Sequence, residues 1–367
     1  MEYNPLGSMV NRKIGYGIVQ PGQSVPDGVP VIKVNNLISG LKSPSELDTT
    51  ARENEAKYSR TRLHGGELIV SVVGTIGKTA IVPKSFAGCN LVRATALIDI
   101  EDELMSKWVK YYFDSPCGQS YIEQNLNTTV QPTLNIKSLV EMPIPIRDTT
   151  EMEKTVLLLS ALDEKIEVNR QINDNLQQQA QAIYSSMFID NPDPAWSHGH
   201  LSDLITVKYG KDHKKLADGI YPVYGSGGIM RYVERPLYNK ESVLIPRKGT
   251  LNNVMYVNQP FWSVDTMFYT EMKLPNVAKF VYHFVKAKDL ASMNAGSAVP
   301  SMTTDILNAM EVVIPSASAL EEFESLVAPM YEAMEANDVQ SKALSQMRDT
   351  LLPKLMSGKI DVSSVQL

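Results

Sequence analysis

The feature that most constrains this chain is an internal repeat at long range. Thr150-Glu-Met-Glu153 and Ser318-Ala-Leu-Glu321 lie 168 residues apart, and both fit the S/T-x-x-E capping box. In that motif a hydroxyl and a glutamate satisfy the free amides of a helix N-terminus. Each motif precedes a long segment with few helix breakers, so we expect two long helices to begin there. The chain should therefore fold as two related halves.

Apolar residues in both segments follow the alternating three and four spacing of a coiled-coil seam. The first seam runs from Leu159 to Met187 through Asn169, and adding 168 gives a second seam from Val327 to Leu355 through Asn337. A seam asparagine costs stability but fixes register when it meets a polar partner. We therefore expect Asn169 and Asn337 to face each other.

Two orientations of the helix pair would align these asparagines. A parallel pair would place Leu176 beside Leu344, whereas an antiparallel pair would place Leu162 near Leu344 and Leu176 near Met330. A helix of about 37 residues spans about 55 Å, so it can carry the chain from the first globular part to a second at its far end. We predict the antiparallel pair, with a pseudo-twofold axis near the two asparagines.

The segments before the helices also repeat. Residues 141–145 resemble 311–315, and residues 67–78 resemble 242–253, where an apolar run ends in a Gly-Thr turn. Prolines in 190–194 mark a linker after the first helix. We predict an α+β fold with two strand-rich globular domains, residues 1–147 and 191–315, each followed by a long helical segment. The central spacer helix is assigned to 148–190, and the distal helix with its tail to 316–367.

The charge is distributed unevenly, although the whole chain carries a formal net charge of −6. Residues 57–93 hold six basic side chains and one acid, and residues 205–250 hold nine and four, so both regions are at +5. The helical segments 151–187 and 316–356 are at −3 and −4. Two basic globular domains with acidic spacers favour a polyanion bound at two places.

Basic, polar and aromatic residues in Gly-containing loops are typical of contacts to phosphates and base edges. Such loops also occur as plain turns, so each loop alone supports the interpretation only weakly. The candidate DNA-binding residues are Lys33, Asn35, Asn36, Lys57, Arg60, Arg62, Thr75, Lys78, Arg93 and Gln131 in the first domain, and Lys211, Lys214, Lys215, Tyr224, Ser226, Arg231, Arg247, Lys248 and Thr250 in the second.

We find no catalytic constellation in the sequence. Residues 74–79 resemble a phosphate-binding loop, but Val72 occupies the position of its first glycine, and a strand rather than a helix is expected to follow. Neither an N-P-P-[FY] motif nor a G-x-S-x-G or H-E-x-x-H motif is present. Two cysteines and five scattered histidines predict no metal site.

No stretch approaches the ~18 consecutive apolar residues of a membrane span. The N-terminus has no basic region followed by an apolar one, so no secretory signal is visible. These observations predict a cytoplasmic protein that does not bind membranes.

Taken in order, several motifs resemble those of type I restriction-modification specificity subunits. They are residues 131–145 before the central helix, Trp196 with Leu201-Ser-Asp-Leu204, Pro246-Arg-Lys-Gly-Thr250, and residues 348–360. The resemblance covers the whole chain. Two departures are that the first domain lacks an opening tryptophan and that Pro329 falls inside the distal helix.

The resemblance implies that each globular domain reads one half of a bipartite target in double-stranded DNA, with the helices as spacer. It also implies partners. Modification subunits would dock on the helices, bind S-adenosylmethionine and methylate adenine after flipping it out of the duplex. Restriction subunits would add ATP- and Mg-dependent cleavage. This chain itself would hold no cofactor and perform no chemistry.

Two other classes of protein remain as alternatives. A fused restriction-methyltransferase would need cofactor motifs in the same chain, and a fragment of one would not. A non-catalytic coiled-coil scaffold would explain the helices but not two basic domains. Co-purification with a methyltransferase would distinguish these alternatives from a specificity subunit.

Overall fold

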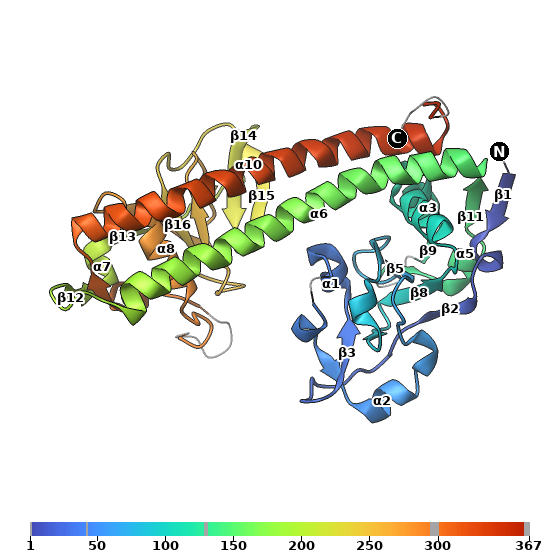
Figure 1. The fold of residues 1–367 in the computed structure, drawn as a ribbon, viewed down its shortest axis with the longest axis horizontal. Helices are drawn as coiled ribbons and strands as arrows, with labels where there is room; N and C mark the ends of the chain where they lie inside the picture. The colour runs from blue at the N-terminus through green and yellow to red at the C-terminus, as the bar shows by residue number, and fades with distance from the viewer. Residues whose placement is uncertain (1, 42, 128–130, 294–300, 363–367) are drawn as a thin grey trace. The chain divides into compact units, whose positions relative to one another are not determined.

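The computed structural model describes residues 2–41, 43–127, 131–293 and 301–362. The chain forms two compact units, of which unit 1 comprises Met1–Val168 with Gln340–Leu367, and unit 2 comprises Asn169–Val339. Two long helices, α6 (Thr149–Ser185) and α10 (Ala317–Met356), contribute one half each to either unit (Figure 1). The predicted α+β class with strand-rich globular parts and two long helices is confirmed. The compact units cut across the four consecutive segments expected from the sequence, because each helix half packs on a globular part.

Unit 1 has short strands and helices before α6. The strands are β1 (Glu2–Pro5), β2 (Arg12–Tyr16), β3 (Val29–Ile32), β4 (Thr49–Thr50), β5 (Leu68–Ser71), β6 (Thr79–Ile81), β7 (Asn90–Leu91), β8 (Thr95–Asp99), β9 (Leu126–Asn127), β10 (Thr133–Leu134) and β11 (Pro143–Ile146). The α-helices are α1 (Val34–Ser39), α2 (Arg52–Ala56), α3 (Glu103–Asp114), α4 (Pro116–Gln124) and α5 (Ile136–Val140). Single 3-10 turns cover Leu6–Ser8, Pro44–Glu46, Ser59–Thr61 and Lys84–Phe86.

Unit 2 opens with the end of α6 and a π-helical turn at Ser186–Asp190. Its strands are β12 (Ser197–His200), β13 (Ile205–Tyr209), β14 (Asp218–Gly225), β15 (Gly228–Val233), β16 (Ser242–Pro246), β17 (Met255–Val257), β18 (Trp262–Ser263), β19 (Met267–Met272) and β20 (Glu311–Ile314). Its shorter helices are α7 (Leu201–Leu204), α8 (Ala278–Lys286) and α9 (Thr304–Asn308).

The sheets of the two units have the same topology, which confirms the internal repeat. A four-stranded sheet has the order β2-β8-β5-β6 in unit 1 and β13-β19-β16-β17 in unit 2. A three-stranded sheet has the order β4-β3-β7 in unit 1 and β15-β14-β18 in unit 2. Strand β3 is parallel to β7, and β14 is likewise parallel to β18. The two-stranded pairs β1-β11 and β12-β20 also correspond, whereas the pair β9-β10 of unit 1 has no counterpart among the described residues of unit 2.

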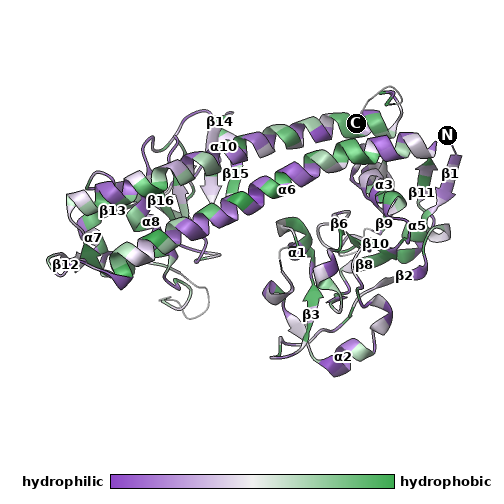
Figure 2. Cartoon of the chain, in the orientation of Figure 1, coloured by the Kyte–Doolittle hydropathy of each residue, from purple (hydrophilic) through white to green (hydrophobic). Residues whose placement is uncertain are grey.

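One apolar core of each unit lies between the four-stranded sheet, one short helix and the long helices, and a second lies between the four-stranded and three-stranded sheets. In unit 1, Trp108 and Phe113 of α3 pack with Leu159 of α6 and Leu355 of α10. In unit 2, Phe280 of α8 packs with residues of both long helices, including Phe323. Figure 2 shows hydrophobic and hydrophilic residues alternating along α6 and α10, as expected for helices with one apolar face.

Both long helices begin two residues before the positions predicted from the capping boxes, so the predicted caps at Thr150 and Ser318 are wrong. The Asp148 side chain accepts a hydrogen bond from the Thr150 amide at 3.0 Å, and Ser316 Oγ accepts one from the Ala319 amide at 3.3 Å. Asp and Ser are both strong N-caps, so each helix gains part of a turn. The actual caps still differ by the period of the repeat.

Within each unit the halves of α6 and α10 are antiparallel, as predicted. In unit 2, Asn169 Nδ2 donates to the Asn337 carbonyl at 3.4 Å, and Asn173 Nδ2 donates to the Met334 carbonyl at 3.2 Å. Asn337 Nδ2 in turn donates to Asn173 Oδ1 at 2.8 Å. Residues later in α6 therefore contact residues earlier in α10, which defines an antiparallel pair. Asn169 and Asn337 lie in contact with each other.

Pro329 lies within α10 without ending it. The helix continues from Ala317 to Met356, and the Pro329 side chain is exposed. A proline inside a helix removes one backbone hydrogen bond and crowds the preceding turn. The departure noted in the sequence is therefore accommodated on the outer face of α10.

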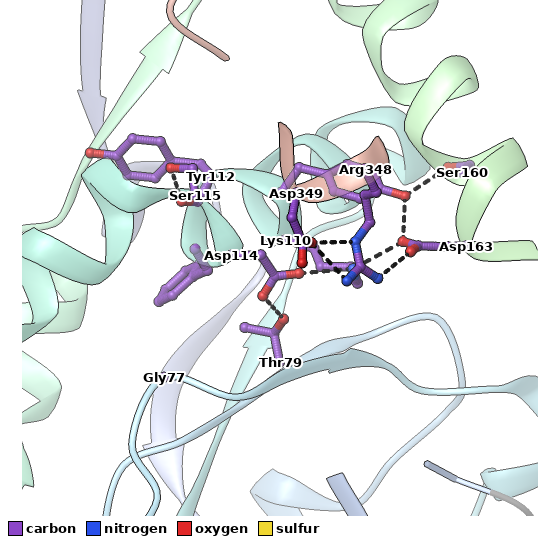
Figure 3. Close-up of polar contacts among 12 residues, drawn as sticks. Gly77, Thr79, Lys110, Tyr112, Asp114, Ser115, Ser160, Asp163, Arg348 and Asp349 are labelled. Carbon is purple, nitrogen blue, oxygen red and sulfur yellow. Dashed lines mark hydrogen bonds and ion pairs between the residues drawn. The ribbon is translucent and has the colours of Figure 1, made fainter. Parts of the chain in front are cut away.

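A polar cluster fixes α3 to the long helices in unit 1 (Figure 3). Asp163 of α6 accepts from Tyr111 at 2.9 Å and from Arg348 of α10 at 2.8 Å. Lys110 lies 3.5 Å from Asp163 and 2.9 Å from Asp114. Burial alone would raise the pKa of Asp163, but Lys110 and Arg348 together lower it below its usual value. We call Lys110, Asp163 and Arg348 the charged cluster.

The equivalent place in unit 2 holds an uncharged cluster, which we define as His283, Tyr331 and Gln181. His283 of α8 is fully buried, with Nδ1 at 2.8 Å from Gln181 Oε1 and Nε2 at 2.9 Å from the Tyr331 hydroxyl. Tyr331 follows Asp163 by the repeat period of 168 residues. Unit 2 also has an ion pair between its short helix and α10, since Lys279 Nζ lies 2.5 Å from Glu324 Oε1. The difference is that the acid Asp163 of unit 1 has the uncharged Tyr331 as its counterpart in unit 2.

We expect unit 2 to lose stability on mild acidification because of His283. Burial lowers the pKa of His283 from 6.5 to about 4, and uncharged Gln181, Tyr331 and Tyr184 surround its ring. The unfolded chain therefore takes up a proton near pH 6.5 while the folded chain does not, so stability is present above that pH and falls below it. The loss should be about 1 kcal/mol between pH 7 and 5.5.

Hydrogen exchange of α8 peptides as a function of pH measures this loss. The His283→Gln variant should show a flatter pH profile, because it keeps polar groups at the site but does not titrate. His64 is exposed, so His64→Gln serves as the control and should keep the wild-type profile. Equal slopes for wild type and His283→Gln would contradict the assignment.

Candidate nucleic-acid interface

The ends of several strands meet at one end of each unit. In unit 1 the parallel strands β3 and β7 end together, since Ile32 pairs with Leu91. Backbone hydrogen bonds of 2.7 Å from Ile18 to Leu91 and 2.8 Å from Arg93 to Ile18 bring in the end of β2. In unit 2, β14 and β18 end together in the same way. We call this end of each unit the loop end.

A Tyr-Gly pair closes the strand at the loop end of both units. Gly17 follows β2, and an added Cβ there would lie 2.1 Å from the Leu91 carbonyl oxygen. Gly210 follows β13, and its Cβ would lie 2.0 Å from the Val264 carbonyl oxygen. Only glycine permits this approach of two backbones. Both glycines therefore hold the loop end together from equivalent positions.

The Gly-Thr turns also lie at the loop end, between β5 and β6 in unit 1 and between β16 and β17 in unit 2. The first turn is held by Ser71 Oγ, which donates to the Thr75 carbonyl at 2.6 Å and accepts from the Lys78 amide at 2.8 Å. Gly74 and Gly249 have φ of 79° and 86°, a conformation that favours glycine. Strand β6 follows the first turn, which confirms the strand expected there instead of a nucleotide-binding helix.

The structure brings most of the predicted unit 1 residues to the loop end. Lys33 and Arg93 follow the paired ends of β3 and β7, and the exposed Thr75 and Lys78 lie in the Gly-Thr turn. Gln131 is two residues before Thr133, which bridges to Val73 beside the turn. Asn35 and Asn36 are the second and third residues of α1, which follows Lys33.

Some of these residues already have partners within unit 1. Lys33 Nζ lies 2.6 Å from Asp48 Oδ2, and Asn36 Oδ1 accepts from the Lys33 amide at 2.7 Å. The Lys33–Asp48 pair is exposed and contributes little to stability, so Lys33 can exchange this partner for another anion. Asn36 has a local structural role at the start of α1.

Three predicted residues, Lys57, Arg60 and Arg62, do not gather with the others. The Arg60 and Arg62 carbonyls accept from Arg12, which begins β2 at the end opposite Tyr16. Arg62 also donates to Glu55 at 2.8 Å, and this hydrogen bond lowers the Glu55 pKa. Lys57 is exposed at the end of the neighbouring helix α2. Their proximity in sequence to the Gly-Thr turn does not place them near it in space.

In unit 2 the loop end gathers Lys211, Ser226, Arg247, Lys248 and Thr250. The Lys211 amide donates to the carbonyl of Ser263 at the end of β18, at 2.8 Å. Ser226 lies in the turn between β14 and β15, and its carbonyl accepts from Asn253 Nδ2 at 2.8 Å, which ties that turn to the Gly-Thr turn. Lys248 and Thr250 are exposed.

Lys214 and Lys215 extend this basic surface along the segment between β13 and β14. Both side chains are exposed, and the Lys214 amide donates to Asp212 at 3.0 Å. This hydrogen bond is the first cause of a lowered Asp212 pKa, so the carboxylate stays ionised next to the lysines. With Lys211, the segment holds three lysines and one acid, so it keeps a net charge of +2.

Two predicted residues of unit 2 are placed differently from the expectation. Tyr224 is buried in the core with its ring against Phe261, and burial raises its pKa, so its hydroxyl is not presented to a ligand. The last four residues of β14, from Pro222 to Gly225, are all buried, which the Gly-rich context hid. Arg231 is half-buried and pairs with Asp218 at 2.7 Å, away from the turn that follows β14.

Tyr209 lies at the loop end but was not among the predicted DNA-binding residues. Its ring is half exposed, and the Arg247 guanidinium lies over it, 5.4 Å from the ring centre. This ring contact and a hydrogen bond of 3.2 Å from Arg247 Nη1 to the Asp265 carbonyl orient the guanidinium. The recurrence of Tyr-Gly at 16–17 and 209–210 was the signal that could have revealed it.

Among the residues that the structure describes, no group of three or more His, Cys, Asp or Glu side chains is arranged to hold a metal ion. No described helix has the length and apolar character needed to cross a bilayer.

The fold and the loop ends define a duplicated protein in which two strand-rich units of the same topology share two long helices. The chain belongs to the type I restriction modification DNA specificity domain family, whose model matches residues 16–178 and 195–323. The resemblance seen in the sequence is thereby confirmed.

Similar proteins include specificity subunits from bacteria and archaea. The chain is 29% identical over 177 residues to the type I restriction enzyme EcoBI specificity subunit of Escherichia coli, a match that covers 47% of this chain and 37% of that protein. It is 23% identical over 309 residues to the MjaIX specificity subunit of Methanocaldococcus jannaschii, covering 72% and 71%. The crystal structure of a type I system S subunit from M. genitalium superposes with a TM-score of 0.56 at 18% identity, over 96% of this chain and 95% of that one, which supports the fold.

Proposed function

We propose that this chain is the DNA sequence-recognition subunit of a type I restriction-modification complex, in which the loop end of each unit reads one half of a bipartite target. The observation that carries the proposal is the duplicated loop end, which presents exposed basic side chains on both units of a member of this family. Phosphate contacts by Lys and Arg give affinity, and neighbouring polar groups reach base edges.

The long helices then have two roles. We propose that α6, a continuous helix of 37 residues, sets the spacing between the two half-sites of the target. The acidic outer faces of α6 and α10 are proposed to dock the modification subunits, and restriction subunits to join that complex. We propose that S-adenosylmethionine, ATP and Mg are bound by those partners and that this chain carries out no chemical step.

Neutralising the lysines near the loop end of unit 2 tests the proposal. In the assembled complex, Lys211→Gln, Lys214→Gln and Lys215→Gln together should weaken binding to all duplexes. The slope of log affinity against log salt should fall by about one unit for each lost phosphate contact. Fluorescence anisotropy with labelled duplex at several salt concentrations measures both quantities.

Arg235 and Lys240 provide the matched control. Both are exposed and precede β16, at the end of that strand opposite Arg247. Arg235→Gln with Lys240→Gln should leave the slope within the error of the wild type. An unchanged slope in the triple lysine variant would remove these lysines from the interface.

A further inference from the structure

The hairpin of β14 and β15 displays apolar side chains at the loop end of unit 2. Ile229 and Met230 follow the turn and are 49% and 61% exposed. Tyr224 pairs with Ile229 while Val223 pairs with Arg231, so Met230 has no opposite residue and forms a β-bulge. A bulge re-aims a side chain out of the regular alternation. Two neighbouring apolar side chains are therefore presented together to the surroundings.

Contacts at the turn hold these side chains in place. An added Cβ on Gly225 would lie 2.6 Å from Met230 Sδ, so the Met230 side chain lies directly over this glycine. The turn itself is tied to the Gly-Thr turn through Ser226, whose Oγ would be 2.6 Å from a Cβ on Gly249. Ile229 and Met230 thus lie beside the turn that carries Lys248.

The combination of apolar and basic side chains selects the ligand. Lys211 and Lys248 at this loop end suit a phosphate backbone, whereas Ile229 and Met230 do not. The DNA major groove admits a two-stranded β-ribbon, and the thymine C5-methyl is an apolar group on its floor. Duplex DNA offers both chemistries within one groove.

This hairpin is also a place where the two units differ. In unit 1, β3 is equivalent to β14, but helix α1 follows it, and the return strand β4 comes only after a 3-10 turn. Both units share one framework of strands, so a difference in what they bind must come from segments that differ, such as this hairpin. The hairpin is therefore suited to distinguish one half of the target from the other.

We propose that the β14–β15 hairpin of unit 2 enters the major groove and that Met230, with Ile229 beside it, reads thymine through its C5-methyl group. This inference rests on the proposed function and adds the base and the side chains that recognise it. Ser226 and the basic side chains of the loop end bind the DNA phosphate backbone and so hold the hairpin in the groove.

Deoxyuridine substitution tests the inference, because uracil lacks only the C5-methyl. The target is first found by sequencing the methylome of cells that carry the assembled system. Affinities of the complex are then measured for duplexes in which each thymine of both half-sites is replaced in turn. Replacement at one or two positions of a single half-site should weaken wild-type binding about fourfold, the effect of withdrawing one methyl group from an apolar contact.

Met230→Ala should bind the thymine and uracil duplexes equally at those positions. Ile220→Ala is the matched control, because Ile220 is 78% exposed on the same hairpin but lies at a different bulge, next to the Val233 pairing. It should keep the wild-type discrimination. Circular dichroism of both variants checks that they are folded.

The outcomes separate this inference from the proposed function. If the complex binds and modifies no specific sequence, the proposed function fails. If it binds specifically but no uracil substitution matters, or Met230→Ala discriminates as the wild type does, the inference alone is overturned. Loss of discrimination in Met230→Ala but not in Ile220→Ala supports it.

Discussion

Replacing Gly210 by alanine is expected to destabilise unit 2 by about 3 kcal/mol or more, because overpacking against backbone cannot be relieved by rotating a side chain. The new methyl group would lie 2.0 Å from the Val264 carbonyl oxygen, so the ends of β13 and β18 would have to separate. Gly17→Ala should act equally in unit 1, where the distance to the Leu91 oxygen is 2.1 Å.

Denaturant unfolding followed by tryptophan fluorescence measures the effect in unit 2. Trp262 reports on the site because its Nε1 donates to the carbonyl of Lys211, the residue after Gly210, at 2.8 Å. Gly227→Ala and Gly15→Ala are the matched controls. A Cβ on Gly227 meets nothing within 4 Å, and one on Gly15 meets nothing closer than 3.8 Å. These two variants should change stability by less than about 0.5 kcal/mol. A mild effect at both Gly17 and Gly210 would show that the strand ends are not fixed by close approach.

Asp163→Asn is expected to cost unit 1 about 2 kcal/mol, because it removes the acid that Lys110 and Arg348 share. The side chain of Asp163 is 25% exposed, so solvent reduces the penalty below that of a fully buried ion pair. Hydrogen exchange of α3 peptides reports the change, since α3 carries Lys110 and Tyr111.

Asp349→Asn provides the comparison on the same arginine. Asp349 pairs with Arg348 at 2.9 Å but is 65% exposed, so its loss should cost at most about 0.5 kcal/mol. If both variants lost the same unfolding free energy, the burial of Asp163 in the charged cluster would not be what makes its ion pairs stabilising.

The sequence predicted the duplicated fold because the repeat leaves marks that need no tertiary information. Seam spacing placed Asn169 opposite Asn337, and the structure has them in contact. The helix starts were misplaced by two residues, because Asp148 and Ser316 compete with the capping boxes and both are good N-caps. Such local alternatives differ by about 1 kcal/mol or less, and packing decides between them.

The candidate site was harder to predict because it depends on which strand ends meet. Charge counts grouped Arg62 with Lys78, but Arg62 pairs with Glu55 elsewhere in unit 1. Tyr224 was assigned from its Gly-rich neighbours, although it lies in an apolar core together with Val223 and Phe261. Parallel pairing of β3 with β7 brings Lys33 and Arg93 together, although they are about sixty residues apart in the sequence. No periodic pattern in the sequence predicts a contact over that distance.

The charged and uncharged clusters have a consequence for how the chain finds its own fold. Because the two units share one topology, the equivalent halves of α6 and α10 could exchange places during folding. Tyr331 would then stand in the place of Asp163 and would leave Lys110 and Arg348 without the acid that they share. The charged cluster therefore favours the native assignment of each helix half to its own unit.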